Sequence, residues 1–273
     1  MKKGILIMLI VLLLGVFLFS GWKLASTLLE YREGEKAYEE LDQFVSVPAP
    51  TQPKRKPSLF QEPEKTPEEP TEPTEPEEIF PWPEVDFAAL LEVNSDVVGW
   101  IYIPDTKVNY PVVQGKNNDQ YLYRLINGKR NSSGSIFLEA NNASDFSEQN
   151  NAIFGHNMKN GSMFAGITGY KRQEFFDKHP YALLLTPEKR YVVRLFSGYV
   201  TDAWGDAWDM TFTQERYQTW LDQRVQKSYF SSDVVPGVDD CVLTFSTCSY
   251  ETAEGRFVVH GILEEYGNKT AVD

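Results

Sequence analysis

The sequence predicts a mainly β domain, a closed β-barrel with helical insertions, preceded by an N-terminal transmembrane helix. Two observations lead to this fold class. Residues 4–22 form an uncharged apolar run, and about eight short segments of strand character follow residue 96 with only a few helical segments between them. Short strands at close spacing, bounded by turn residues, are typical of closed β-barrels.

The apolar run 4–22 is 19 residues long, which is enough to span a bilayer. Lys2 and Lys3 precede it and predict a cytoplasmic N-terminus, with the rest of the chain outside the cell. We therefore expect residues 1–24 to form a single-pass anchor in the cell membrane. A cleaved signal peptide is the alternative, although residues 21–26 match a small-x-small cleavage site poorly.

Residues 25–83 do not have the pattern of a folded domain. Residues 25–45 predict a short polar helix, and residues 48–83 then contain eleven of the sixteen prolines among many glutamates. Prolines three residues apart within 70–76 match the period of polyproline II. We expect an extended acidic linker that acts as a spacer, with a reach of about 110 Å at roughly 3.1 Å per residue. A docking site for a proline-binding partner is the alternative.

Residues 84–273 are numerous enough for one domain with a substantial core. They hold 17 Lys or Arg and 25 Asp or Glu, a net charge of −8, within a chain whose net charge is −13. Proteins that bind nucleic acids depend on clusters of Lys and Arg against the phosphates. We therefore expect no nucleic-acid partner.

Helix and strand patterns alternate through this domain. Asp86 caps a helix that ends at residue 93, a second helix covers 162–170, and Thr213 caps a third that ends at residue 228. In the third helix Arg216 and Arg224 are expected to face solvent, and the apolar face consists of Tyr217, Trp220, Leu221 and Val225. The predicted strands cover 97–103, 108–113, 134–139, 151–156, 181–185, 191–200, a segment that ends at 248, and 256–264.

Two cysteines lie in one strand segment, Cys241 at its start and Cys248 at its end. Seven residues of strand cover roughly 23 Å, whereas a disulfide needs Cα atoms within about 7 Å, so we expect no bridge. Cys248 adjoins a loop and is the candidate nucleophile. Cys241 is expected to be a small buried residue. Arg256 opens the next strand, where its guanidinium would favour a thiolate or an oxyanion.

A cysteine nucleophile usually needs a histidine, and the chain has three. His156 closes a predicted strand and enters a glycine-rich turn. Taken alone, this position leaves a structural and a catalytic role equally open. The presence of Cys248 and Arg256 favours the catalytic role. His179 lies in a polar connection and is expected to be structural or solvated. His260 shares the side-chain parity of Arg256 but lies roughly 13 Å further along the strand, so we expect a hydrogen-bonded sheet residue.

These segments resemble a known family. Leu-Thr-Phe-Ser-Thr-Cys at 243–248, followed by Arg256, resembles the active-site signature of sortases. Phe-Gly-His-Asn-Met at 154–158 resembles the histidine segment of class B members. The long helix before the cysteine strand fits class B, and so do three further segments in the same order, 96–104, 110–115 and 134–138. The resemblance covers residues 84–265 and implies a closed eight-stranded β-barrel of the sortase type.

The resemblance implies a catalytic domain at residues 84–273 that acts as a cysteine transpeptidase on the outer face of a Gram-positive membrane. Cys248 would attack the carbonyl of a threonine in the sorting signal of a surface protein, and an amine of a peptidoglycan precursor would resolve the thioester. His156 would protonate the leaving amine and deprotonate the incoming one, and Arg256 would hold the oxyanion. Side chains alone would carry this reaction, without a cofactor or a metal.

The resemblance also matches Asn118, Leu122 and Ser246 to positions near the sorting peptide. Two positions depart from the family pattern, because Phe154 stands where some members have tyrosine and Ser249 where others have an acidic residue. Two other functions remain open. One is a pilin polymerase of the same chemistry that uses a lysine amine of another pilin. The other is a membrane-tethered wall-binding module with an inert cysteine.

Overall fold

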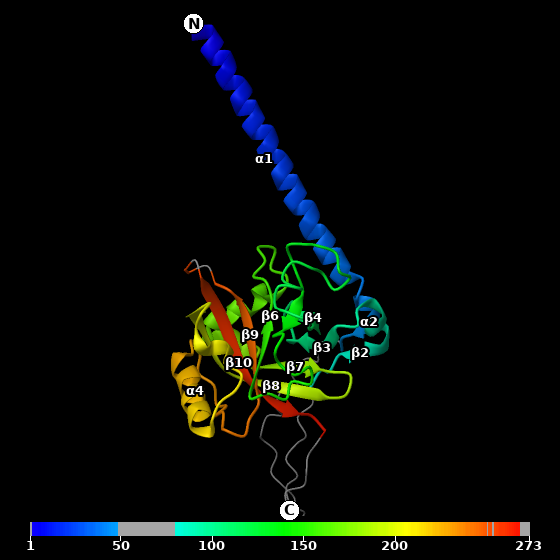
Figure 1. Cartoon of the computed structure of the whole chain (residues 1–273), viewed down its shortest axis with the longest axis vertical. Helices are drawn as coiled ribbons and strands as arrows, with labels where there is room; N and C mark the ends of the chain where they lie inside the picture. The colour runs from blue at the N-terminus through cyan, green and yellow to red at the C-terminus, as the bar shows by residue number, and fades with distance from the viewer. Residues whose placement is uncertain (1, 49–79, 250, 253, 268–273) are drawn as a thin grey trace, which may run out of the picture.

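A long helix projects from a β-barrel (Figure 1). The computed structural model describes residues 2–48, 80–249, 251–252 and 254–267. The projecting helix is α1 (Lys2–Glu39), and its N-terminus is the end farthest from the barrel. Among the described residues, α1 is the one helix that is long and apolar enough to cross a membrane. This is consistent with the predicted membrane anchor.

Eight strands close into one barrel in the order β10-β8-β7-β3-β4-β5-β6-β9, which confirms the predicted fold class. Neighbouring strands are antiparallel except for the parallel pairs β4–β5 and β6–β9. All eight predicted strands are present, with ends that differ by no more than two residues from those expected. They are β3 (Val97–Tyr102), β4 (Asn109–Val113), β5 (Ile136–Leu138), β6 (Asn150–Phe154), β7 (Tyr181–Leu185), β8 (Arg190–Asp202), β9 (Val242–Cys248) and β10 (Gly255–Glu265).

The barrel interior is filled by alternate residues of its strands, because successive side chains of a strand point to opposite faces. Ile153, Phe245 and Phe257 belong to one buried apolar cluster inside the barrel. On β6, β9 and β10 the residues that alternate with these three therefore face outward. Cys248 and Arg256 are among them. The outer face of these strands is the one on which a site can be built.

Short helices decorate the barrel. Asp86 caps α2 (Phe87–Val93) by accepting a hydrogen bond from the Ala89 amide, and Thr213 caps α4 (Gln214–Lys227) in the same way, as predicted. The helix expected at 162–170 is a 3-10 helix, η2 (Phe164–Lys171). The helix predicted at 25–45 is the end of α1 followed by the 3-10 helix η1 (Asp42–Phe44). Two short helices were not anticipated, because they are brief turns without a periodic pattern: α3 (Gln173–Lys178) and η3 (Asp206–Trp208).

Two expectations for α4 are wrong. Arg224 is fully buried, and Val225 is 45% exposed. The Arg224 guanidinium donates hydrogen bonds of 2.8 and 2.6 Å to the Asp206 carboxylate and one of 2.9 Å to the Tyr199 hydroxyl. A charge can be buried when it is paired and hydrogen-bonded. Residue type on a helical face could not reveal this, because Asp206 and Tyr199 lie in other segments.

The segment after the membrane span packs on the barrel. Leu41 is buried, and β1 (Val45–Ser46) pairs with β2 (Glu84–Val85) in a two-stranded antiparallel sheet. The residues on both sides of the Pro/Glu-rich segment thus lie side by side. The domain bounds and the role of that segment as a spacer stay predictions. Its predicted extended conformation falls on residues 49–79, outside the described residues.

Candidate active site

Cys248 and Arg256 lie directly opposite each other in the β9–β10 register. Opposite residues of antiparallel strands have Cβ atoms about 4.5–5.5 Å apart, so the thiol and the guanidinium are neighbours. A cleft of about 370 Å³ opens over them. It contains all six residues that the sequence singled out, namely Asn118, Leu122, His156, Ser246, Cys248 and Arg256.

His156 follows β6, and one edge of its ring is held by the protein. Its Nε2 lies 2.6 Å from the carbonyl oxygen of Leu122. Because a carbonyl only accepts, Nε2 carries the proton and Nδ1 is the basic nitrogen of the neutral ring. Gly134 abuts the same edge, since a β-carbon there would overlap the Leu122 carbonyl and lie 3.1 Å from Cδ2 of His156. With φ at +58° as well, this position requires glycine.

Cys248 is a free, half-buried thiol at the end of β9. The Asn157 side chain donates a hydrogen bond of 2.9 Å to the Cys248 carbonyl, and the Thr247 hydroxyl donates one of 2.7 Å to the Gly155 carbonyl. Residues 155 and 157 flank His156 in the chain. The two bonds therefore hold the cysteine strand and the histidine segment in a fixed relation.

Arg256 is available to a ligand. Among the described residues its guanidinium donates one hydrogen bond, of 3.1 Å, to the neighbouring Gly255 carbonyl, and it forms no ion pair with Glu251 or Glu254. Glu251 pairs instead with Lys171. A surface ion pair is therefore not what holds Arg256 beside Cys248.

The three residues expected to contact the substrate differ in their hydrogen-bond partners within the protein. Asn118 uses its side chain within the protein, donating to Glu139 and accepting 2.9 Å from the Ala140 amide. Leu122 supplies the carbonyl bound to His156. Ser246 is 1% exposed, and its hydroxyl has no partner among the described residues. Its unsatisfied hydroxyl makes Ser246 the strongest of the three as a ligand contact.

Comparisons with known proteins agree with this geometry. A Sortase domain model matches residues 101–264. Sortase B of Listeria monocytogenes is 30% identical over 254 residues, which is 92% of this chain and 93% of that protein. The chain belongs to class B of the sortase family. Sortase B of Staphylococcus aureus is 29% identical over 263 residues, 95% of this chain and 96% of that protein.

Solved structures of class B sortases match the fold. A crystal structure of Staphylococcus aureus sortase B has a TM-score of 0.63 at 32% identity, over 66% of this chain and 86% of that one. Sortase B of Bacillus anthracis has a TM-score of 0.68 at 29% identity, over 87% of this chain and 99% of that one. Sortases are cysteine transpeptidases, and so is this chain.

Sequence reasoning missed one wall of the sortase cleft, which is Trp208 on η3. Its indole stacks near Phe154 with ring centroids 6.5 Å apart, and its buried Nε1 has no partner among the described residues. The Asn150 amide fixes η3 by donating 3.1 Å to the Ala207 carbonyl and 2.9 Å to the Asp209 carbonyl. No local pattern marks such a turn, because a side chain about 60 residues away in the chain holds it.

The other two histidines lie outside the sortase cleft. His260 is fully buried, with Nδ1 2.8 Å from the Thr244 hydroxyl and Nε2 3.2 Å from the Tyr199 hydroxyl. Burial, and secondarily the Arg224 charge, lowers the pKa of His260 well below its ordinary value. His179 places Nδ1 3.0 Å from the Pro104 carbonyl. Both are hydrogen-bonded to the protein, as the sequence led us to expect.

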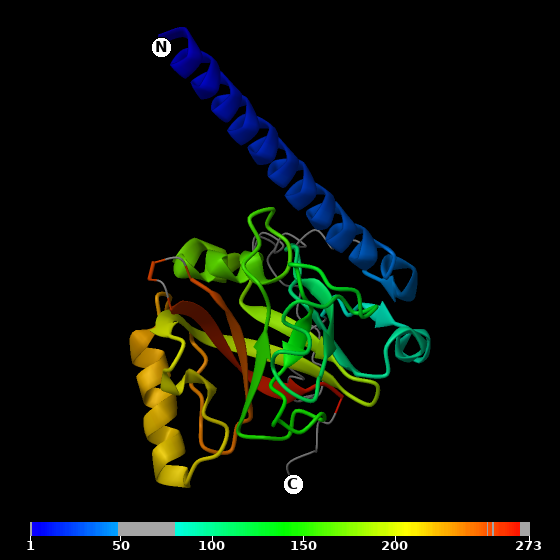
Figure 2. The same cartoon turned by 45° about the horizontal axis from the view of Figure 1, so that its top comes forward.

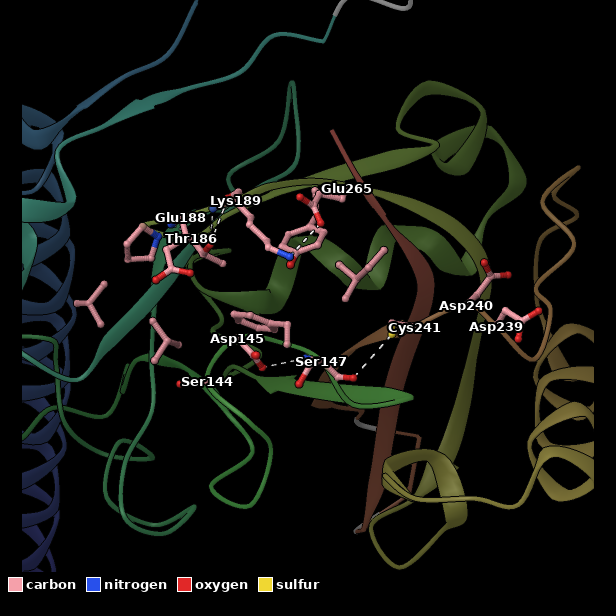
Figure 3. Close-up of a pocket in the computed structure, with 16 residues that line it drawn as sticks. Ser144, Asp145, Ser147, Thr186, Glu188, Lys189, Asp239, Asp240, Cys241 and Glu265 are labelled. Atoms are coloured by element: carbon pink, nitrogen blue, oxygen red, sulfur yellow. Dashed lines mark hydrogen bonds and ion pairs between the residues drawn. The ribbon is translucent and has the colours of Figure 1, made fainter. Parts of the chain in front are cut away.

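A larger cavity of about 550 Å³ lies at the opposite end of β9, around Cys241 (Figure 3). The expectation that Cys241 is buried is wrong, because the residue is half-buried and lines this cavity. Its Sγ lies 3.9 Å from the Ser147 carbonyl. Burial, with the nearby charges of Asp240 and Glu148, raises the pKa of the Cys241 thiol. The residues that line this cavity include neither a histidine nor an arginine.

Proposed function

We propose that this sortase is a membrane-anchored transpeptidase that cleaves the C-terminal sorting signal of a surface protein after a threonine and transfers the acyl group to an amine of a peptidoglycan precursor. One observation carries the proposal. Cys248, Arg256 and His156 line a single cleft, with the first two directly opposite in the β9–β10 register. Membership of class B supports the same chemistry.

In the first half-reaction the Cys248 thiolate attacks the threonine carbonyl, a C–S bond forms and the carbonyl oxygen becomes an oxyanion. Arg256, directly across the strand pair, donates to that oxyanion. The intermediate collapses to a thioester as the C–N bond breaks. The proton that the Cys248 thiol has lost is held on Nδ1 of His156, the nitrogen that Leu122 does not occupy, and from there it passes to the leaving amine.

In the second half-reaction the incoming amine attacks the thioester carbonyl and His156 accepts its proton. A C–N bond forms, the C–S bond breaks, and the Cys248 thiolate returns. No oxidant, metal or cofactor enters this balance.

The position of α1 supports action at the membrane. Lys2 and Lys3 precede the apolar run and favour a cytoplasmic N-terminus, which would leave the barrel extracellular. The end of the β9–β10 hairpin that bears Cys248 and Arg256 lies on the side of the barrel from which α1 projects (Figures 1 and 2). With α1 in the bilayer, that end of the hairpin would lie on the membrane side of the barrel. That placement suits an amine presented by a membrane-bound precursor.

The test is a transfer assay with the full chain in detergent micelles. A panel of quenched sorting peptides is offered with either a peptidoglycan stem-peptide amine or a lysine-bearing pilin peptide, and the products are identified by mass spectrometry. We expect acyl transfer to the stem-peptide amine and none in Cys248→Ala. Transfer to the pilin lysine alone would favour the pilin polymerase. Absence of any cleavage across a broad panel would contradict both and favour the wall-binding module.

A further inference from the structure

One face of α1 beyond the apolar run contacts the barrel loop at residues 131–135. The Asn131 side chain donates 2.9 Å to the Glu30 carbonyl, and the Ser132 amide donates 2.8 Å to the Glu30 carboxylate. Gly34 comes so close that a β-carbon there would lie 2.7 Å from the hydroxyl of Ser133. Tyr38 then donates to the Gly134 carbonyl over 2.7 Å.

The spacing of these helix residues is regular. Positions 30, 34 and 38 are four residues apart and lie on one face of a helix. The helix runs without interruption from Lys2 to Glu39, so this face is continuous with the apolar run. Eight residues separate residue 22 from residue 30, which is about 12 Å of helix. The contact with the loop therefore begins close to the membrane.

The loop that α1 holds is the one that abuts His156. Tyr38 is bonded to the carbonyl of Gly134, and Gly134 packs against the His156 ring and the Leu122 carbonyl. The next residue, Ser135, donates its amide 3.1 Å to the Tyr121 carbonyl and so holds the turn that carries Leu122. Two of the contacts that orient the imidazole thus depend on a loop fixed by the anchor helix.

A second path leads from Tyr38 to the other side of the histidine segment. The Tyr38 ring packs edge-on against Tyr110, with centroids 5.3 Å apart. The Tyr110 hydroxyl accepts 3.0 Å from the Met163 amide, and Met163 forms a bridge with Asn157, next to His156. Tyr38 is therefore connected to the histidine segment by two routes, one through Gly134 and the other through Tyr110 and Met163.

We propose that the extracellular part of α1 is a positioning element of the active site: through Glu30, Gly34 and Tyr38 it holds the loop 131–135 against His156 and so sets the imidazole relative to Cys248. The anchor then contributes to turnover as well as to location. This inference rests on the proposed roles of His156 and Cys248. Undocking of the helix would lower activity while the barrel stays folded.

The first test compares two tyrosines of the same helix in the full chain in detergent micelles. Tyr38→Phe removes a hydroxyl that lies 2.7 Å from the Gly134 carbonyl oxygen and 3.1 Å from the Ser135 hydroxyl, both in the loop 131–135, whereas Tyr31→Phe removes one without a partner among the described residues. Both rings pack on the same core cluster, so the two changes are matched. We expect Tyr38→Phe to lower kcat by roughly three- to tenfold, the worth of one hydrogen bond, with KM for the sorting peptide unchanged. Tyr31→Phe should keep the wild-type kcat.

Assays run well below the thermal midpoint of both variants separate positioning from stability. A merely structural Tyr38 would lower the midpoint and leave the kcat of the folded protein intact, which would overturn the proposal. An equal loss of kcat in Tyr31→Phe would overturn it too. Because Phe keeps the ring that packs on Tyr110, the substitution tests the hydroxyl bond and little else.

A second variant disturbs the same contact by adding a methyl group that overlaps the loop. The methyl group of Gly34→Ala would lie 2.7 Å from the Ser133 hydroxyl and 3.0 Å from the Asn131 side-chain oxygen, and would push the helix off the loop. Alanine favours helix over glycine, so a loss of kcat could not be ascribed to a weaker helix. Ser133→Ala removes the nearest obstacle and should restore part of the loss in the double variant. No loss in Gly34→Ala would count against the proposal.

A third readout needs no sorting peptide and so separates this inference from the proposed function. In a Cys241→Ala background, iodoacetamide labels Cys248 at a rate set by its thiolate. We expect Tyr38→Phe to slow that rate at pH 7 in the same direction as His156→Ala, and Tyr31→Phe to leave it unchanged. If no peptide is cleaved yet labelling follows this order, the transpeptidation scheme fails and the positioning inference stands. Equal labelling in all variants would refute the inference.

Discussion

The two ends of β9 each carry a cysteine and open into a cavity, yet only one end has the groups of a nucleophilic site. At the Cys248 end, Arg256 stands across the strand pair and His156 lines the same cleft. At the Cys241 end the cavity is larger, but its charged lining consists mainly of carboxylates, and Lys189 is paired with Glu265. Cavity size and thiol exposure therefore do not identify the site; converging cationic and basic groups do.

The two ends of the strand differ in the charges beside the thiol. Negative neighbours disfavour a thiolate, and Asp240 and Glu148 raise the pKa of Cys241 beyond the effect of burial. Opposite Cys248 stands a guanidinium, which would favour an oxyanion formed there. The same residue type on the same strand thus has a different expected reactivity at each end.

The largest expected effect tests this contrast directly. Cys248→Ala should lower peptide cleavage by at least about 10³-fold, because no other group can form the thioester. Cys241→Ala should keep most of the activity. Steady-state cleavage of a quenched sorting peptide measures both. A comparable loss in a folded Cys241→Ala would transfer the active site to the other end of the strand.

The histidines provide a second comparison. His156→Ala should eliminate measurable turnover, since the imidazole moves the proton in both half-reactions. His260→Ala should instead lower the free energy of unfolding by about 2–4 kcal/mol, because it leaves a cavity and removes one hydrogen bond each from Thr244 and Tyr199. Turnover and urea unfolding of both variants separate the two effects. Full activity in His156→Ala would refute its assigned role.

Two substitutions of Arg256 separate the effect of its charge from the effect of its planar guanidinium. Arg256→Ala should lower turnover by about 10²- to 10³-fold, the usual worth of one oxyanion donor. Arg256→Lys keeps the charge but loses the planar fork, so we expect it to recover only a small part of the rate. Both variants should fold normally. Rates within a few-fold of wild type would show that Arg256 is a surface residue without a catalytic role.

The buried arginine behind the cleft gives a pH-dependent prediction. Hydrogen bonding to Arg224 lowers the pKa of Asp206, so the pair stabilises the fold above the ordinary pKa of an aspartate and loses its effect as pH falls through the lowered value. The carboxylate is 45% exposed, so we expect only about 1 kcal/mol. Asp206→Asn should therefore be less stable than wild type in urea at pH 7, and the difference should shrink toward pH 3. A difference that does not change with pH would contradict this.

The smallest expected effect concerns the thiol at the other end. In Cys248→Ala, iodoacetamide should label Cys241 slowly at neutral pH, because the pKa of its thiol is raised. Asp240→Asn removes a neighbouring negative charge and should speed labelling at pH 8 by roughly twofold. Mass spectrometry over a time course measures both rates. Fast labelling of Cys241 at pH 7 would remove the electrostatic contrast between the two ends.

Local patterns in the sequence determined most of the architecture. Alternating apolar residues and turn residues located all eight strands, since one face of each strand must enter the core. Asp86 and Thr213 marked two helix starts, because a cap satisfies backbone amides within its own segment. The signature around Cys248 was enough to find the family. Each of these features depends on residues close together in the chain.

Only the tertiary structure decided which distant segments meet. The burial of Arg224 depends on Asp206 and Tyr199, and the place of Trp208 depends on Asn150. The docking of Tyr38 on Gly134 joins residues 96 positions apart, so the helix beyond the membrane span looked in sequence like a polar stub before a spacer. A polar side chain is read as solvated until its partner is known. Chain topology supplies that partner, and periodicity within one segment carries no information about it.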